Sequence, residues 1–315
     1  MKLILFGYYG YRNVGDEQLL DESVRLLKNI ANNLDFIVAT GNYSLPFPTF
    51  SRWNLFDWFR HLIRADALIF GGGSVFQSRS SFGSLLIYLM VVCLARLFRC
   101  RVLLLSHGWG PFKFRWHQRL AVWVLCAPHV VRSWRDEMSR DSFGQSNDPV
   151  FCDLALLQQR QLDPKVLTTD SYVIGISPTI SSYKQLIKVT EKFKTVTIIN
   201  QLNQLVSKTD ILLEDIWDQP SNIGLLITDR YHSAIWASKF GVPWVAYSDD
   251  PKLVALAKAT NQLIFAPYEE LNASVISLIE AVPTFIPDQQ LLDWYDSFAS
   301  YRAEIGEWLH DQLSH

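Results

Sequence analysis

Short apolar segments alternate with helical segments along the first half of the chain, and this alternation constrains the fold more than any other feature. The expected strands are Lys2–Phe6, Phe36–Ala39, Ala67–Phe70, Val102–Ser106 and Val130–Ser133. The expected helices are Glu17–Ile30, Leu55–Arg64, Leu85–Phe98, His117–Cys126 and Asp136–Phe143, with a Pro-containing loop at Asn42–Ser51. This order predicts a parallel sheet with helices on both faces.

The alternation stops and then resumes, which predicts two domains. Leu156–Thr169 shows no such pattern and is the expected linker. A second set of expected strands is Tyr172–Ser177, Val196–Asn200, Gly224–Ile227 and Trp244–Tyr247. A chain of 315 residues suits two α/β domains of about 150 residues each. We therefore predict domains at 1–160 and 170–285. A helical segment at 286–315, which includes Gln289–Leu313, is expected to pack at their junction.

Composition excludes several classes of protein. The chain is 49% hydrophobic and 19% charged, so it can bury large cores and is not disordered. Its formal net charge is -2 and it has no basic stripe, so we expect no nucleic-acid partner. The four cysteines have neither metal-ligand spacing nor the spacing of a secreted scaffold, and are Cys93, Cys100, Cys126 and Cys152. They predict reduced core thiols, no bound metal and a cytoplasmic protein.

Membrane-spanning segments are not expected. The apolar start Leu3–Phe6 is too short for a signal peptide and runs directly into glycines. Leu85–Ala95 is continuously apolar but well short of the roughly 20 residues that a spanning helix needs. A buried helix of the wound sheet is the favoured interpretation. Peripheral contact with the inner face of the membrane is the alternative.

A strand-to-helix junction in the second half carries an arginine and a histidine. Ile223–Ile227 is apolar, and the next helix is expected to begin with Thr228 or Asp229 as its cap. Arg230 and His232 then fall in the first turn, where free backbone N–H groups attract anions. The side chains predict a site for a small phosphate or carboxylate.

Lys252 occupies a similar position after the next strand. It follows Pro251 in the expected first turn of a helix, where a cation is unfavourable unless it serves an anion.

The first half has matching junctions at the carboxyl ends of its strands. The loop Gly7–Gly15 precedes Asp16 and Glu17. Both carboxylates can cap the following helix, or one of them, with Asp16 favoured, can act as a base. The glycine spacing does not fit the dinucleotide pattern, so no nicotinamide cofactor is expected. Gly71-Gly72-Gly73 suits an anion-binding turn, and Ser74 can cap the following helix or contact a ligand.

Three larger side chains follow the neighbouring strands. His107 lies where ligand-contacting residues collect, although a lone histidine is often structural. Trp109 can stack on a sugar ring or fill its turn. Arg135 lies at a similar edge and can bind a ligand or form a surface salt bridge with Asp136 or Glu137. Junctions of this kind in both halves suggest that the two halves face each other across a cleft.

These motifs occur in an order that resembles the polysaccharide pyruvyl transferase family. The motifs are Gly7-Tyr8-Tyr9-Gly10, Asn13-Val14-Gly15-Asp16-Glu17, Gly71-Gly72-Gly73-Ser74, Gly108-Trp109-Gly110-Pro111, Arg135-Asp136-Glu137-Met138-Ser139, Asp229-Arg230-Tyr231-His232, Gly241-Val242-Pro243 and Asp250-Pro251-Lys252. The opening loop and the Arg-x-His block most resemble the subgroup that modifies cell-wall-linked or S-layer-anchoring polysaccharide. Two segments depart from the family pattern: Ser106-His107-Gly108, where the family usually has Gly-Gln-Gly, and Ile176-Ser177-Pro178-Thr179, which lacks a basic residue.

The resemblance implies two Rossmann-like domains similar to GT-B glycosyltransferases. It also implies phosphoenolpyruvate as donor, with no further cofactor, and a sugar or lipid-linked polysaccharide as acceptor. The product would be a pyruvate ketal on two hydroxyls of one sugar. The N-terminal domain is then the acceptor side, with Tyr9, Glu17 and Trp109, and the C-terminal domain is the donor side.

The resemblance suggests roles for the remaining residues. Arg230 and Arg135 are expected to bind the donor, with Lys252 and Ser74 assisting. His232 is expected to be the general acid, and Asp16 or His107 the base. The rival interpretations are a nucleotide-sugar glycosyltransferase with a similar architecture and a non-catalytic glycan-binding relative.

Overall fold

A computed structural model describes residues 1–30, 34–41, 45–157, 173–177, 196–200, 211–213, 223–260, 262–265 and 289–314. Its contacts divide the chain into two compact units. Unit 1 consists of residues 1–158 and 298–315, and unit 2 of residues 159–297. One boundary falls in the predicted linker Leu156–Thr169, and the other falls inside the last helix.

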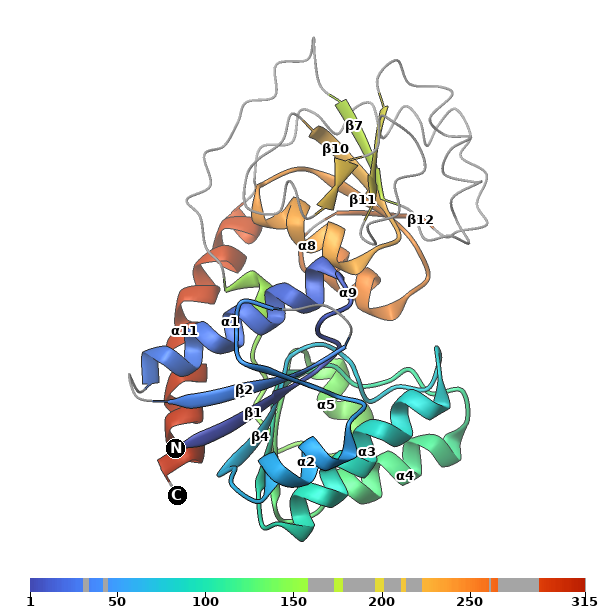
Figure 1. Cartoon of the computed structure of the whole chain (residues 1–315). Helices are drawn as coiled ribbons and strands as arrows, with labels where there is room; N and C mark the ends of the chain where they lie inside the picture. Colours follow the sequence, from blue (N-terminus) through green and yellow to red (C-terminus); the bar gives the residue numbers. More distant parts are fainter. Residues whose placement is uncertain are drawn as a thin grey trace. The chain divides into compact units, whose positions relative to one another are not determined.

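Unit 1 is built on a parallel sheet of six described strands (Figure 1). They are β1 (Lys2–Phe6), β2 (Asp35–Thr40), β3 (Thr49–Ser51), β4 (Ala67–Gly71), β5 (Arg101–His107) and β6 (Val130–Trp134), in the order β3-β2-β1-β4-β5-β6. The expectation of a loop throughout Asn42–Ser51 is wrong at its end, because Thr49 pairs with Val38 as part of edge strand β3. Residues 42–44 lie outside the described part.

Helices cover both faces of this sheet, as predicted. They are α1 (Val14–Ile30), α2 (Leu55–Leu62), α3 (Phe82–Leu97), α4 (Arg115–Leu125), α5 (Glu137–Phe143), the 3-10 turn η1 (Leu154–Leu156) and α11 (Gln289–Ser314). Helices α2, α3, α4 and α5 share one apolar core with the strands. Helix α1 lies on the other side of the sheet (Figure 1). From residue 298 onward, α11 contacts unit 1, where Arg302 bonds Glu22 and Arg101 bonds Gln312.

Unit 2 repeats the same winding. Its strands are β7 (Val173–Ser177), β8 (Val196–Asn200), β9 (Ile211–Leu212), β10 (Ile223–Thr228), β11 (Trp244–Tyr247) and β12 (Leu263–Phe265), in the order β12-β11-β10-β7-β8-β9. The described helices are α8 (Tyr231–Lys239) and α9 (Pro251–Ala259). In both sheets the winding direction reverses at the centre, between β1 and β4 and between β7 and β10. Such switch points are where open α/β sheets bind ligands. The predicted α/β class with doubly wound Rossmann-like units is confirmed.

Several local expectations need correction. The cap of α8 is Arg230, not Thr228 or Asp229, because Thr228 Oγ1 instead accepts the Arg230 N–H at 2.9 Å. Ser74 caps no helix, since α3 begins later, after Ser81.

The exposure of side chains corrects two further expectations, one about the cysteines and one about the apolar helix. Cys93 and Cys126 are exposed, so only the other two thiols are buried. The stretch Leu85–Ala95 is buried on its inner side only, because Leu86 and Met90 are exposed. Among the described helices, none is both long and apolar enough to cross a membrane.

An aromatic cluster fixes α2 against the sheet. Trp58 is fully buried, and its ring meets Phe6 and Phe50 edge-on at centroid distances of 4.8 and 4.9 Å. Its indole N–H donates to the Arg52 carbonyl at 2.9 Å.

We predict that Trp58→Ala lowers the free energy of unfolding of unit 1 by about 3–5 kcal/mol, because it leaves a cavity and an unsatisfied carbonyl. Chemical denaturation followed by circular dichroism measures the change. Trp123→Ala is the matched control, since Trp123 is 73% exposed and should change stability by no more than about 0.5 kcal/mol. Equal effects of the two substitutions would contradict this assignment of the core.

Candidate active site

Four strand-end loops of unit 1 are joined by hydrogen bonds. The loop after β4 accepts a bond from the loop after β5, where Gly108 N donates to the Gly73 carbonyl at 2.6 Å. The residue after β6 is bonded in turn, since Arg135 N donates to the His107 carbonyl at 3.2 Å. The loop after β1 joins them through Tyr9, whose hydroxyl donates to the Gly71 carbonyl at 2.9 Å. The predicted residues of the first half therefore share one edge of the sheet.

Glycine is required where these loops approach each other. Gly72 and Gly73 have φ angles of +72° and +75°, which L side chains rarely adopt. A Cβ at Gly108 would overlap the Ser74 hydroxyl and lie 2.8 Å from the Arg135 guanidinium. The glycine motifs thus place Ser74 and Arg135 against the same backbone.

Asp16 lies at this edge in the first turn of α1. It is half-buried, and a Cβ at Gly73 would lie 3.6 Å from its Oδ1. Loss of solvation raises the Asp16 pKa from 3.8 to about 8. The Glu17 and Asp153 carboxylates raise this pKa further, against the opposing effects of Arg135 and Asn13. Asp16 therefore holds a proton at neutral pH, which is unusual for a carboxyl group and typical of functional sites.

Arg135 is buried between two carboxylates. Its Nη1 contacts Asp153 Oδ2 at 3.1 Å, and its Nε contacts Asp136 Oδ2 at 3.2 Å. Asp153 is itself buried and caps the turn η1 by accepting the Ala155 N–H. The predicted surface pairing with Asp136 exists, but the larger constraint is the buried pair with Asp153.

Glu17 and Tyr9 hold the first loop in place. Glu17 Oε1 accepts the Gly10 N–H at 2.8 Å, and burial raises the Glu17 pKa. The Tyr9 ring is buried so close to Gly7 that a Cβ there would lie 2.8 Å from two of its atoms. Both residues are at the predicted edge, with structural contacts that account for their presence.

His107 and Trp109 are core residues. His107 is fully buried beside the Phe76 ring, and its Nε2 accepts the Val75 N–H at 3.3 Å, so the imidazole is neutral. Trp109 is buried among aromatic rings, including those of Phe112 and Phe143, both at 4.8 Å. These surroundings favour the structural alternatives for both side chains.

The sequence motifs did not identify two buried charged residues of this edge, Asp153 and Arg52. Asp153 lies in a segment that has no recognisable motif. Arg52 follows the unrecognised strand β3, donates to the Gly7 carbonyl at 3.0 Å and lies 4.9 Å from the centre of the Phe6 ring. An arginine beside a run of aromatic residues was the only available signal for Arg52.

Unit 2 carries a hydroxyl cluster at its own switch point. Ser177, at the end of β7, hydrogen bonds Ser233 of α8 at 2.7 Å between hydroxyl oxygens. Thr228, at the end of β10, donates its hydroxyl to the Ser177 carbonyl at 2.8 Å. This cluster ties the start of α8 to both central strands.

The three predicted cationic or titratable residues of unit 2 lie at this same edge. Arg230 caps α8, and His232 lies in its first turn. Lys252 lies in the first turn of α9, which Asp250 caps by accepting the Lys252 N–H at 3.0 Å. Because β10 and β11 are parallel neighbours, the two helix N-termini lie side by side. Burial lowers the Arg230 pKa, against the effect of Asp229, and the guanidinium stays charged.

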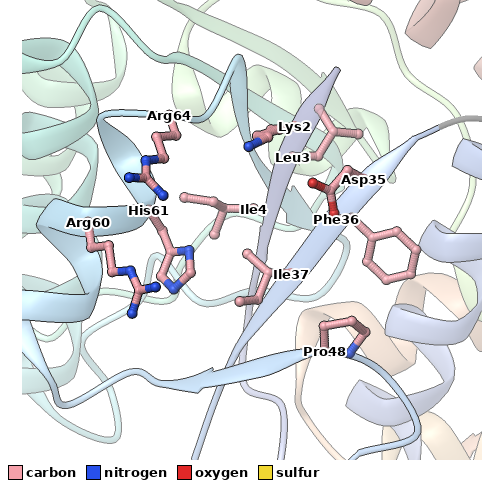
Figure 2. A pocket seen from close by; sticks show the side chains of 10 residues that line it. All are labelled: Lys2, Leu3, Ile4, Asp35, Phe36, Ile37, Pro48, Arg60, His61 and Arg64. Atoms are coloured by element: carbon pink, nitrogen blue, oxygen red, sulfur yellow. The ribbon is translucent and has the colours of Figure 1, made fainter.

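One cavity of unit 1 lies at the opposite edge of the sheet. It measures about 200 Å³, and Arg60 and His61 of α2, with Arg64 just after this helix, face Lys2 and Asp35 across it (Figure 2). Since these last two residues begin β1 and β2, this cavity is separate from the carboxyl edge described above.

The chain belongs to the polysaccharide pyruvyl transferase family, whose profile matches residues 13–251. This membership indicates a pyruvyl transferase that acts in polysaccharide biosynthesis. No curated protein matches the sequence.

Solved structures with a similar fold are GT-B-like enzymes. The UDP-GlcNAc 2-epimerase from Neisseria meningitidis, bound to UDP-GlcNAc, has a TM-score of 0.59 and 11% identity, covering 98% of this chain and 99% of its own. Anabaena Alr3699/HepE in complex with UDP has a TM-score of 0.58 and 12% identity, covering 100% of both chains. The wall teichoic acid polymerase TagF has a TM-score of 0.56 and 12% identity, covering 99% of this chain and 88% of its own. These likenesses confirm the GT-B-like fold.

The raised pKa of Asp16 predicts a pH-dependent stability. Between about pH 4 and pH 8 the unfolded chain releases a proton that the folded chain keeps, so Asp16 makes folding less favourable as the pH rises. Asp16→Asn should therefore gain stability relative to the wild type across this window and keep a constant difference above it. Urea denaturation at a series of pH values measures the difference.

Asp35→Asn, which removes an exposed carboxylate, controls for the change of net charge. A wild-type and Asp16→Asn pair whose stabilities run parallel from pH 4 to pH 8 would show that Asp16 ionises normally.

The buried pair predicts a second stability effect. Arg135→Met leaves Asp153 buried without its cation and should cost about 3–5 kcal/mol. Arg140→Met is the control and should cost less than about 1 kcal/mol, because among the described residues Arg140 pairs only with the exposed Asp141 and Glu137. Adding Asp153→Asn to Arg135→Met should restore much of the loss. If the double variant is no more stable than Arg135→Met, the cost does not come from the buried charge.

Proposed function

We propose that this protein transfers the pyruvyl group of phosphoenolpyruvate to two hydroxyls of one sugar, forming a pyruvate ketal and releasing phosphate. The observation that carries the proposal is the position of Arg230, His232 and Lys252 at the carboxyl edge of the unit 2 sheet, at the starts of α8 and α9. Membership of the polysaccharide pyruvyl transferase family supports this choice of reaction.

The donor requires such a cationic site. Phosphoenolpyruvate carries a carboxylate and a phosphate, close to three negative charges near neutral pH. Arg230 offers a planar fork of donors at the start of α8, where backbone N–H groups also favour anions. Lys252 adds a second cation at the start of α9. Each charge-assisted bond contributes roughly 1.5–3 kcal/mol.

The proposed reaction begins with the transfer of a proton. His232 donates it to C3 of the donor, and positive charge develops at C2. A sugar hydroxyl attacks C2 and loses its proton to a base, and the phosphate leaves with the electrons of its C–O bond. A neighbouring hydroxyl then closes the ketal, and its proton leaves with the phosphate.

Asp16 is the better of the two candidate bases. Its pKa of about 8 makes it a far stronger base than an ordinary carboxylate, and it is only half-buried. His107 is fully buried, and its Nε2 already accepts a backbone bond. Ser74 and Glu17, beside Asp16, are the proposed neighbours of the substrates.

Three of the predicted site residues have no part in these steps. Arg135 is engaged by two carboxylates, and its predicted contact with the donor stays a prediction. Tyr9 and Trp109 are too deeply buried for us to assign them acceptor contacts.

The proposed acceptor is a sugar of a cell-surface polysaccharide. The sequence motifs favour the subgroup that modifies cell-wall or S-layer-anchoring polymers. A lipid-linked form of the polymer on the inner face of the membrane is part of the proposal.

Donor binding predicts the effect of Arg230→Lys. The lysine keeps the charge but loses the bidentate geometry, so the KM for phosphoenolpyruvate should rise about 10- to 100-fold. Phosphate release with a sugar acceptor measures it. Lys258→Met is the control, since Lys258 is exposed in the last turn of α9. A donor dependence that Arg230→Lys leaves unchanged would remove Arg230 from the donor site.

The same assay tests the base. Activity should rise with pH up to about 8 as Asp16 loses its proton, and Asp16→Asn should lose about 10²–10⁴-fold. A falling profile over that range would instead make Asp16 an acid.

Calorimetric titration with a UDP-sugar tests the glycosyltransferase alternative. Glycan binding without phosphate release would contradict transfer altogether.

A further inference from the structure

The outer sides of three helices in unit 1 are unusually apolar. We call this surface the α2–α4 face and define it by eight exposed residues: Phe56, Phe59, Ile63, Leu86, Met90, Leu97, Trp116 and Trp123. Trp123 and Phe56 are each 73% exposed, and Leu97 is 70% exposed. Large apolar side chains that gather on one surface in this way mark an interaction site.

The three helices form one continuous layer. Phe59 of α2 meets Phe98, next to the end of α3, at 5.6 Å between ring centres, and Phe82 of α3 meets Trp116 of α4 at 4.9 Å. Their inner sides belong to the core of the sheet. Figure 1 shows α2, α3 and α4 side by side on the same side of the strands. The exposed residues therefore share one surface that faces away from the sheet.

Charge on this surface is predominantly positive. Residues 67–135 contain no aspartate or glutamate, and Asp57 is the only acidic residue within α2, α3 or α4. Exposed arginines border the apolar residues: Arg60, Arg64, Arg96, Arg99, Arg115 and Arg119. Within the described parts of the chain, none of these six arginines forms a salt bridge. Their positive charge is available to an external partner.

Two hollows adjoin the face. A groove of about 350 Å³ between α3 and α4 is lined by apolar side chains, among them Val92 and Trp123, with Arg96 also in its wall. The cavity of Figure 2 adds Lys2 beside Arg60 and Arg64, opposed by the single carboxylate of Asp35. Apolar space next to cationic side chains suits an acyl chain and its anionic headgroup.

The charge pattern decides between possible occupants. A two-fold interface between copies would press this face against itself and bring six arginines together with only Asp57 to pair them. An anionic bilayer complements both features, because tryptophan and apolar residues enter its interface while arginines reach the headgroups. We infer that the α2–α4 face docks this protein on a membrane that contains anionic phospholipid. This inference does not depend on the pyruvyl donor.

Vesicle sedimentation of the full chain tests the inference. Partition into phosphatidylcholine vesicles that contain phosphatidylglycerol should exceed partition into pure phosphatidylcholine at least about tenfold. Leu97→Glu with Trp123→Glu should reduce it at least about tenfold, because two exposed apolar side chains that would enter the bilayer are lost. Arg96→Glu with Arg99→Glu should remove the preference for phosphatidylglycerol. Trp123→Phe should retain binding.

Controls come from outside the face. Met138→Glu, on α5, and Lys28→Glu, on α1, change charge at exposed positions and should leave partition unchanged. Thermal melts of every variant report folding, and exposed positions should melt like the wild type. No preference for anionic vesicles, or equal partition of the Leu97→Glu/Trp123→Glu variant, would overturn the inference. A wild-type dimer that this variant dissociates, without vesicle binding, would show that a second copy covers the face. Phosphate release from phosphoenolpyruvate is measured separately, so failure here leaves the proposed reaction untouched.

Discussion

The buried ion pair between Arg135 and Asp153 is the interaction on which the carboxyl edge of the first sheet depends. It joins the end of β6 to the turn η1, and the close approach of Gly108 to the guanidinium joins β5 to both. Because both partners are almost fully buried, neither can leave without stranding the other's charge. The pair holds the loops after β5 and β6, while Glu17 and Tyr9 hold the loop after β1.

The pair also shapes the chemistry of Asp16. Three carboxylates, Asp16, Glu17 and Asp153, lie near one guanidinium that already serves Asp153 and Asp136. Little positive charge is left to stabilise an ionised Asp16, so desolvation dominates and the proton stays bound. Unit 2 has the same winding but carries cations at its carboxyl edge, since Arg230 begins α8 and Lys252 lies in the first turn of α9. The same strand order therefore supports a proton-holding carboxyl group in one unit and a cationic site in the other.

Much of the fold could be predicted from the sequence, because long periodic segments carry strong signals. Lys2–Phe6, Val196–Asn200 and Trp244–Tyr247 were placed with the bounds that the structure has. The short edge strands β3, β9 and β12 were not predicted, because two or three residues are too few to show an alternation of apolar and polar side chains. The cap of α8 was misplaced because Thr228 and Asp229 are both good caps, and the structure instead gives the Thr228 hydroxyl a bond across the sheet.

The site was predicted less completely, for a physical reason. Strand-end motifs give the edge on which a residue lies, and the structure places Asp16, Ser74 and Arg230 at the predicted edges. They do not give burial, so the sequence left a ligand contact and a structural role open for both His107 and Trp109, which the structure packs in aromatic surroundings. Asp153 and Arg52 act through partners distant in sequence, and no local pattern encodes such pairs.

The measurement that tests this account most directly is the titration of Asp16 itself. Carboxyl ¹³C chemical shifts of aspartate-labelled protein, with the Asp16 resonance assigned by its loss in Asp16→Asn, report the ionisation of this one group. We expect its midpoint at about pH 8. A midpoint near pH 4, the ordinary value for aspartate, would contradict both the buried charge balance and the proposed role of Asp16 as base.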